Sequence, residues 1–248
     1  MITTQYTDTN TTHKQVIQFV KQQKNLDPDF KVIDLGGGAD GWSKEIVDFI
    51  ADIGVTDTDQ TKRVDLCNPA DFNKLLSHVE KHGKFDYAIC THTLEDVYNP
   101  FLALQNLPKI AKGGVITMPS IVAELSPVQS LAWRGYLHHR WIYEFREEKI
   151  LVIPKVTLFE SLVTVKLTKT KNSEVRFDWT DEIPYAVFMN HYLGPDAQTV
   201  IKEFSALIDS INQRCPGRFQ IIKIRSRPRR VALRVVRFFK RLFASELP

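Results

Sequence analysis

Residues 32–41, which read Val-Ile-Asp-Leu-Gly-Gly-Gly-Ala-Asp-Gly, decide the fold class of this 248-residue chain. The apolar residues at the start of the stretch predict a buried strand, and we expect a helix over residues 42–50 directly after the glycines. Gly36, Gly38 and Gly41 stand at the spacing G-x-G-x-x-G, in which close backbone contacts with a nucleotide cofactor require residues without a Cβ atom. The stretch therefore predicts a strand, a cofactor-binding turn and a helix.

Predicted strands and helices alternate along much of the remaining chain. After a short helix within the first 30 residues, strands are predicted at 52–56, 63–66, 85–90 and 115–118, helices at 69–81 and 102–110, and a turn at 112–114. Later strands are predicted at 149–154, 161–167, 176–179 and 219–224, with a helix at 196–212. This alternation predicts an α/β fold with a three-layer, doubly wound, mostly parallel sheet of seven strands. An aromatic-rich insertion at 121–143 follows the fifth strand.

Composition and charge set the broad class of the protein. Hydrophobic residues make up 43% of the chain and charged residues 25%, which is typical of a globular protein and excludes a disordered or collagen-like chain. The three cysteines form no disulfide or zinc pattern, and the polar N-terminus does not resemble a signal peptide. We therefore expect a cytoplasmic protein with one domain over residues 1–225.

The carboxylates beside the glycine turn favour one class of cofactor over another. Asp34 ends the first predicted strand, and a carboxylate there would repel the pyrophosphate of a dinucleotide. S-adenosylmethionine (SAM) instead carries a sulfonium and an ammonium group, which carboxylates attract. Asp57 follows the second predicted strand and could accept hydrogen bonds from both ribose hydroxyls. Asp65 could accept from the adenine amino group, with Leu66 against the ring.

Three segments together resemble the class I SAM-dependent methyltransferase family: residues 32–38, residues 85–95 and residues 107–118. The resemblance implies that the glycine turn lies against the methionine part of SAM and that the segment after the fourth strand borders the transferred methyl group. Where many members have Leu-Glu-His, this chain has Leu94-Glu95-Asp96. Carried over by position, the implied cofactor residues are Asp34, Gly36, Gly38, Asp57, Asp65 and Thr91, with His92 beside them.

The methyl acceptor is predicted to be a hydroxyl group of a sugar or glycan. Methyltransferases of this fold that act on base amino groups usually carry an Asn/Asp-Pro-Pro-Tyr/Phe signature, and residues 91–94 read Thr-His-Thr-Leu. A hydroxyl acceptor requires a base, for which His92, His138 and His139 are the candidates. The aromatic and basic side chains of residues 133–141 indicate an acceptor pocket. His92, Glu95, Asp96 and His139 could be drawn into a metal site, but their spacing is not diagnostic and we predict no metal.

Three other functions stay open at this point: an NAD-binding oxidoreductase, a non-catalytic module with this fold, and an RNA methyltransferase. The last depends on the C-terminal segment. Residues 211–245 contain eleven Lys or Arg and no Asp or Glu, and residues 226–248 are predicted to form a basic amphipathic helix. Such a helix could pack on the acidic body of the protein, on a partner subunit or on an anionic membrane surface, whereas the sequence does not favour nucleic acid.

Overall fold

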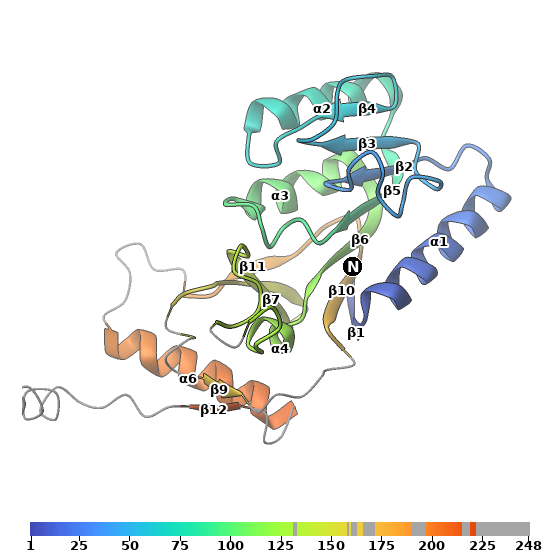
Figure 1. Cartoon of the computed structure of the whole chain (residues 1–248). Coiled ribbons are helices and arrows are strands. Elements are labelled where there is room, and N and C mark those ends of the chain that lie inside the picture. Colours follow the sequence, from blue (N-terminus) through green and yellow to red (C-terminus); the bar gives the residue numbers. More distant parts are fainter. Residues whose placement is uncertain are drawn as a thin grey trace, which may run out of the picture. The chain divides into compact units, whose positions relative to one another are not determined.

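The computed structural model of the chain describes residues 1–130, 133–157, 159, 163–165, 172–189, 197–214 and 219–221 (Figure 1). The chain divides into two compact units. The first contains Met1–Val156 and Leu167–Asp196, and the second contains Thr157–Lys166 and Ala197–Pro248. The predicted helix at 226–248 lies outside the described residues. No helix in the described ranges combines the length and the apolar character needed to cross a bilayer.

The first unit is built on a mixed sheet of seven strands from the described part of the chain. Its order is β4 (Thr61–Arg63), β3 (Phe49–Asp52), β2 (Val32–Leu35), β5 (Phe85–Thr91), β6 (Ala111–Pro119), β10 (Glu174–Thr180) and β1 (Ile2–Thr7). Neighbouring strands from β4 to β6 are parallel, and β10 is antiparallel to both β6 and β1. The α/β class is confirmed, with one strand opposing the direction of the other six.

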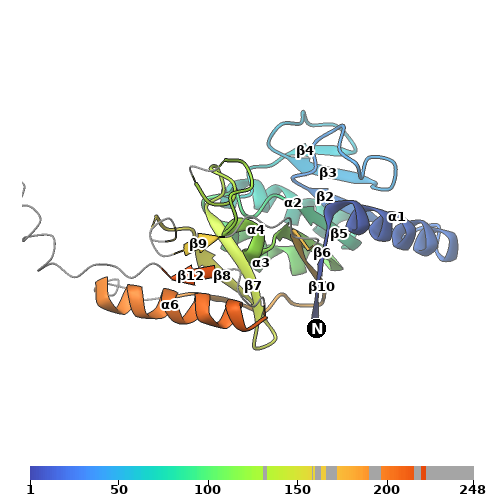
Figure 2. The same ribbon diagram turned by 60° about the horizontal axis from the view of Figure 1, so that its bottom comes forward.

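Helices cover both faces of this sheet, as Figures 1 and 2 show. On one face, α1 (Thr9–Leu26) packs Val16 and Val20 against Val32 and Ile89 of the central strands. On the other face, α2 (Pro69–His82) and α3 (Pro100–Ile110) pack against Ile33 and its neighbours. Because successive strand residues point to opposite faces, Val32 and Ile33 belong to different core clusters. The central strands β2, β3 and β5 are therefore mostly apolar, as expected for strands buried on both faces.

A small three-stranded sheet follows β6 in the same unit. It consists of β7 (Trp141–Arg146), β8 (Lys149–Pro154) and β11 (Tyr185–Val187), and the short helix α4 (Ile121–Glu124) precedes it. The Tyr143 hydroxyl donates a 2.8 Å hydrogen bond to the carbonyl of Leu94, which joins β7 to the loop after β5. This buried contact brings the end of the aromatic-rich insertion to the carboxyl edge of the main sheet.

The second unit contains α6 (Ala197–Arg214), β9 (Val163–Val165) and β12 (Phe219–Ile221). The two strands pair antiparallel. Phe204 of α6 meets Phe159 edge-to-face, with ring centroids 4.9 Å apart. The predicted helix at 196–212 is confirmed.

Several predicted boundaries are wrong. Residues 42–46 form turns instead of the predicted helix, and β3 begins at Phe49 instead of Asp52. The Asp48 carboxylate accepts a hydrogen bond from the amide of Val32, which holds this segment against β2. The predicted turn at 112–114 is part of β6, while β1, β7 and β11 were not predicted.

Candidate functional site

In the glycine turn after β2, Gly36 and Gly37 are packed too closely to accept side chains. Gly36 (φ +85°) and Gly38 (φ +65°) adopt backbone conformations that favour glycine. A Cβ atom on Gly36 would collide with the side chain of Thr93, and one on Gly37 would collide with the Asp34 carboxylate. The backbone of the turn therefore lies directly against Asp34 and the loop after β5.

Asp34 is fully buried and only partly satisfied. The Ser43 hydroxyl donates to Oδ2, whereas Oδ1 has no hydrogen-bond partner among the described residues. Burial raises the pKa of Asp34 to about 6, the hydrogen bond from Ser43 opposes this shift, and the charge of Asp52 adds to it. A buried carboxylate with an unpaired oxygen is costly, and a cation or hydrogen-bond donor at this position would offset the cost.

Because β3 ends at Asp52 and not at residue 56 as predicted, the acid at the end of this strand is Asp52 and not Asp57. Asp52 is its last residue, and its Oδ1 accepts a 2.6 Å hydrogen bond from the Gly54 amide. Asp57 lies five residues further on, where Lys62 pairs with it at 2.6 Å and the Arg63 amide donates to it at 2.8 Å. The prediction placed Asp57 at the end of the strand, so the position that it described is occupied by Asp52.

A cleft of about 790 Å³ lies beyond the ends of β3 and β4, and both Asp57 and Asp65 line it. The Asp65 carboxylate accepts from the Cys67 amide at 2.8 Å. Leu66 is buried in the main core cluster and is not among the residues that line the cleft. The structure thus brings the two predicted acids together but places Leu66 elsewhere.

Thr91 ends β5 at the same edge of the sheet, and His92 follows it directly. The Trp42 indole donates a 3.3 Å hydrogen bond to the Thr91 hydroxyl, and the Trp42 ring stacks on His13 with centroids 4.0 Å apart. Because Trp42 directly follows the glycine turn, its hydrogen bond to Thr91 holds the end of the turn against the end of β5. Thr91 therefore lies beside Trp42, directly after the glycine turn, while its contact with the cofactor stays a prediction.

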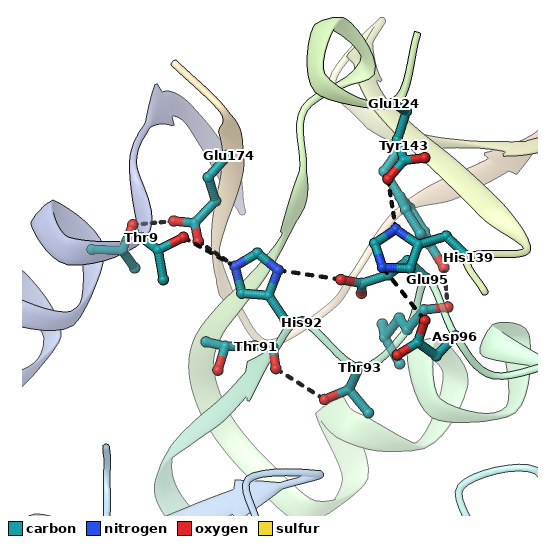
Figure 3. A network of polar contacts seen from close by, with 12 residues as sticks. Thr9, Thr91, His92, Thr93, Glu95, Asp96, Glu124, His139, Tyr143 and Glu174 are labelled. Carbon is teal, nitrogen blue, oxygen red and sulfur yellow. Dashed lines mark hydrogen bonds and ion pairs between the residues drawn. The ribbon is translucent and has the colours of Figure 1, made fainter. Parts of the chain in front are cut away.

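His92 lies between two buried glutamates (Figure 3). Its Nε2 is 2.7 Å from Glu174 and its Nδ1 is 3.2 Å from Glu95, while Thr12 donates to the other oxygen of Glu174. Burial alone would lower the pKa of His92, but the hydrogen bonds and charges of Glu174 and Glu95 outweigh it and raise the pKa to about 10. His92 is therefore protonated at neutral pH, which does not fit its predicted role as a base.

His138 and His139 form a second group with Asp96. Their Nε2 atoms lie 3.7 and 3.6 Å from Asp96 Oδ1. The buried Nδ1 of His139 is 2.6 Å from Glu124 (Figure 3). The other oxygen of Glu124 is paired with Lys155 at 2.7 Å. These contacts fix the orientation of the His139 ring.

Sequence reasoning missed Asp52, Glu124, Lys155 and Glu174. Asp52 had a local signal, because it closes the apolar run that begins at Ile46. The other three had none: they reach their histidines from elements between 15 and 82 residues away, or through a neighbour.

No protein-family profile and no curated protein sequence matches the chain. Among solved structures, the chain is similar to the N-terminal domain of EvdMO1 with SAH bound, at 14% identity and a TM-score of 0.31, covering 65% of this chain and 78% of that one. It is also similar to the same domain in the presence of SAH and D-fucose, at 13% identity and a TM-score of 0.26, covering 65% and 79%. Likenesses this distant carry no argument about function, which must come from the site itself.

Proposed function

We propose that the protein is a SAM-dependent methyltransferase that transfers a methyl group to a hydroxyl of a sugar or glycan. The observation that carries the proposal is the buried Asp34 carboxylate beneath a glycine turn, one of whose oxygens has no partner in the part of the chain that the structure describes. A positively charged methionine moiety would supply the missing donor there. Asp52, at the end of the next strand, would hold the ribose hydroxyls, and Asp57 and Asp65 would line the adenosine end of the cleft.

The local backbone favours SAM over a dinucleotide. Dinucleotide sites place the pyrophosphate at the N-terminus of the helix that follows the glycine turn. In this chain residues 42–46 form turns, so no helix N-terminus faces that position. The negative charge of ionised Asp34 beneath the glycine turn also opposes a phosphate. Both observations argue against the NAD-binding alternative.

The loop after β5 and the segment before β7 supply the groups for the acceptor. His92 is protonated, so its role is to position Glu95 and Glu174 at the edge of the site. His139 has the geometry of a base: Nδ1–H donates to Glu124, which leaves the Nε2 lone pair toward Asp96 and solvent-exposed His138. The acceptor hydroxyl would lose its proton to His139 or His138.

Binding and transfer can be tested separately. SAM and its product SAH should bind in calorimetry, whereas NAD should give no heat. Radiolabelled SAM should then pass its methyl group to one member of a panel of free sugars, sugar nucleotides and oligosaccharides. Binding of NAD in place of SAM would overturn the proposal, and binding of SAM with no transfer to any acceptor would favour the non-catalytic module.

The end of β3 at Asp52 predicts that Asp52, and not Asp57, binds the ribose hydroxyls of SAM. Asp52→Asn should weaken SAM binding by about 10–100-fold, the usual effect of losing charge-assisted hydrogen bonds. Asn keeps the oxygen that accepts from the Gly54 amide, so the turn should survive. Asp57→Asn is the matched control, and because Lys62 and Arg63 already engage Asp57, it should change the affinity less than about 3-fold. If calorimetry shows a larger loss of SAM affinity in Asp57→Asn than in Asp52→Asn, then Asp57 is the residue that binds the ribose.

SAM binding should also depend on pH through Asp34. In the free protein its pKa is about 6, and a bound cation stabilises the ionised form and lowers that pKa. Binding therefore releases a proton near pH 6, and the affinity should fall as the pH drops below 6, approaching tenfold per pH unit. Calorimetry in two buffers with different ionisation enthalpies measures the released proton directly. No proton release at pH 6 would mean that SAM does not contact Asp34.

A further inference from the structure

We infer that Asp96, His138 and His139 form a site for one divalent transition-metal ion of the zinc class. Each residue offers one ligand atom, and these three atoms lie within 4.8 Å of one another. Two imidazole nitrogens and a carboxylate oxygen are a donor set that zinc and its neighbours prefer, and three protein ligands leave a coordination position open.

The distances are close to those of a coordination sphere. Ligands bound at about 2.0–2.1 Å in a tetrahedron lie about 3.3–3.4 Å apart. The separations from Asp96 Oδ1 to Nε2 of His138 and of His139 are 3.7 and 3.6 Å. The third separation, between the ligand nitrogens of the two histidines, is bounded only at 4.8 Å. Closing the sphere therefore takes a movement of up to about 1.4 Å, which the exposed side chains of Asp96 (43%) and His138 (59%) can make.

The surroundings of His139 supply a second, independent observation. Its side chain is only 6% exposed, and its Nδ1 lies 2.6 Å from the Oε1 atom of Glu124. A hydrogen bond from Nδ1–H to a carboxylate fixes the tautomer in which Nε2 carries the lone pair, and this carboxylate–histidine arrangement is the usual support of a metal-binding imidazole. Lys155 holds Glu124 in turn at 2.7 Å.

The tautomer leaves two acceptor atoms facing each other. The Nε2 lone pair of His139 and the carboxylate of Asp96 are 3.6 Å apart, and among the described residues Asp96 has no ionic partner besides the two histidines. A bound cation would resolve this contact.

The open position would take the acceptor hydroxyl, a step that rests on the proposed function. Metal-bound oxygen has a lowered pKa, so the hydroxyl would release its proton to water. The resulting oxygen would form a bond to the methyl carbon of SAM as the carbon–sulfur bond breaks, and the sulfur would keep the electron pair as neutral SAH. With a metal bound, the Nε2 atom of His139 would coordinate the ion and would not accept the proton of the acceptor hydroxyl.

Metal binding can be measured without SAM. The untagged, chelator-treated protein should carry His82→Ala, because His78 and His82 lie one helical turn apart with ring centroids 4.5 Å apart and could themselves chelate a metal. Titration with Zn²⁺ in a calorimeter should show one ion per chain, and Co²⁺ should give the intense visible absorption of a four-coordinate site.

The variants decide the assignment. Asp96→Asn and His138→Asn should each weaken Zn²⁺ binding by at least about 10–100-fold, and Glu124→Gln should do so through His139. The first two positions are exposed, so thermal unfolding should be unchanged. Absence of uptake, or equal uptake by Asp96→Asn, would overturn the inference. If the protein binds one ion but transfers no methyl group, the metal-site inference stands and the proposed methyltransferase function fails.

Discussion

Replacing Asp34 by Asn is expected to stabilise the free protein and almost abolish its binding of SAM. With a pKa of about 6 in the fold and 3.8 as the ordinary value, ionised Asp34 opposes folding by about 3 kcal/mol at pH 7. Asn removes the charge and keeps an oxygen that accepts from Ser43. Its amide group remains without an acceptor, so the expected net gain is about 1–2 kcal/mol.

The loss of SAM binding has the same origin. The unpaired Oδ1 atom is the feature that a cationic ligand would satisfy, and losing a charge-assisted contact of this kind should weaken binding by about 100-fold. Asp40→Asn is the matched control, because Asp40 lies in the same turn but its side chain is 91% exposed and paired with Lys44. That variant should change neither property by a measurable amount.

Denaturant unfolding and SAM calorimetry on the two variants check both effects. Opposite changes in stability and affinity in Asp34→Asn would identify a residue kept for binding at the expense of stability. A loss of stability together with unchanged SAM affinity would show that Asp34 is a structural hydrogen-bond acceptor for Ser43 and the turn, and the proposed function would lose its main support.

Local sequence predicted those elements whose stabilising contacts are local. The helix α2 is an example: Asn68 accepts a hydrogen bond from the Ala70 amide at its start, and Phe72 and Leu75 repeat at helical spacing to face the core. The segment after the glycine turn shows the opposite case. Ile46 and Phe49 fit a helix or a strand, and the choice is made by distant partners, since Ser43 bonds to Asp34 and Asp48 to Val32.

The candidate site also contains features that the local sequence predicts and features that depend on distant residues. The glycine turn and the acids after the strands could be predicted, because the carboxyl ends of neighbouring parallel strands meet at one edge. The electrostatic environment of each histidine could not. His92 was chosen as a base from its position after β5, but Glu174 reaches it from β10, 82 residues away, and reverses its chemistry. Only the pairing of β10 beside β6 brings that carboxylate into the site.

Glu174→Ala should therefore be among the most destabilising single substitutions in the first unit. Glu174 is buried and accepts hydrogen bonds from both His92 and Thr12. Its removal leaves a protonated imidazole and a buried hydroxyl without their acceptor, which should lower the free energy of unfolding by about 3 kcal/mol. For a chain of this size the midpoint of thermal unfolding should fall by roughly 6–12 °C.

Two comparisons separate loss of charge pairing from loss of packing. Glu174→Gln keeps the volume and one acceptor oxygen, so it should be less destabilising than the alanine variant. Glu80→Ala, at an exposed position on α2, should have no measurable effect. Equal losses in the Gln and Ala variants would assign the effect to the charge of Glu174, and no loss in either would mean that His92 is neutral.

The pH dependence of stability tests directly whether His92 is protonated in the folded protein. The pKa of His92 rises from its ordinary 6.5 to about 10 on folding, so its contribution is complete below pH 6.5, declines as the pH rises, and is gone above about pH 10. Wild-type protein should thus lose stability between pH 7 and pH 10. In Glu174→Ala only Glu95 still pairs with His92, so the decline should be shallower and should end at a lower pH. A decline of equal slope in both proteins would place its origin outside the Glu95–His92–Glu174 group, and His92 would again be free to act as a base.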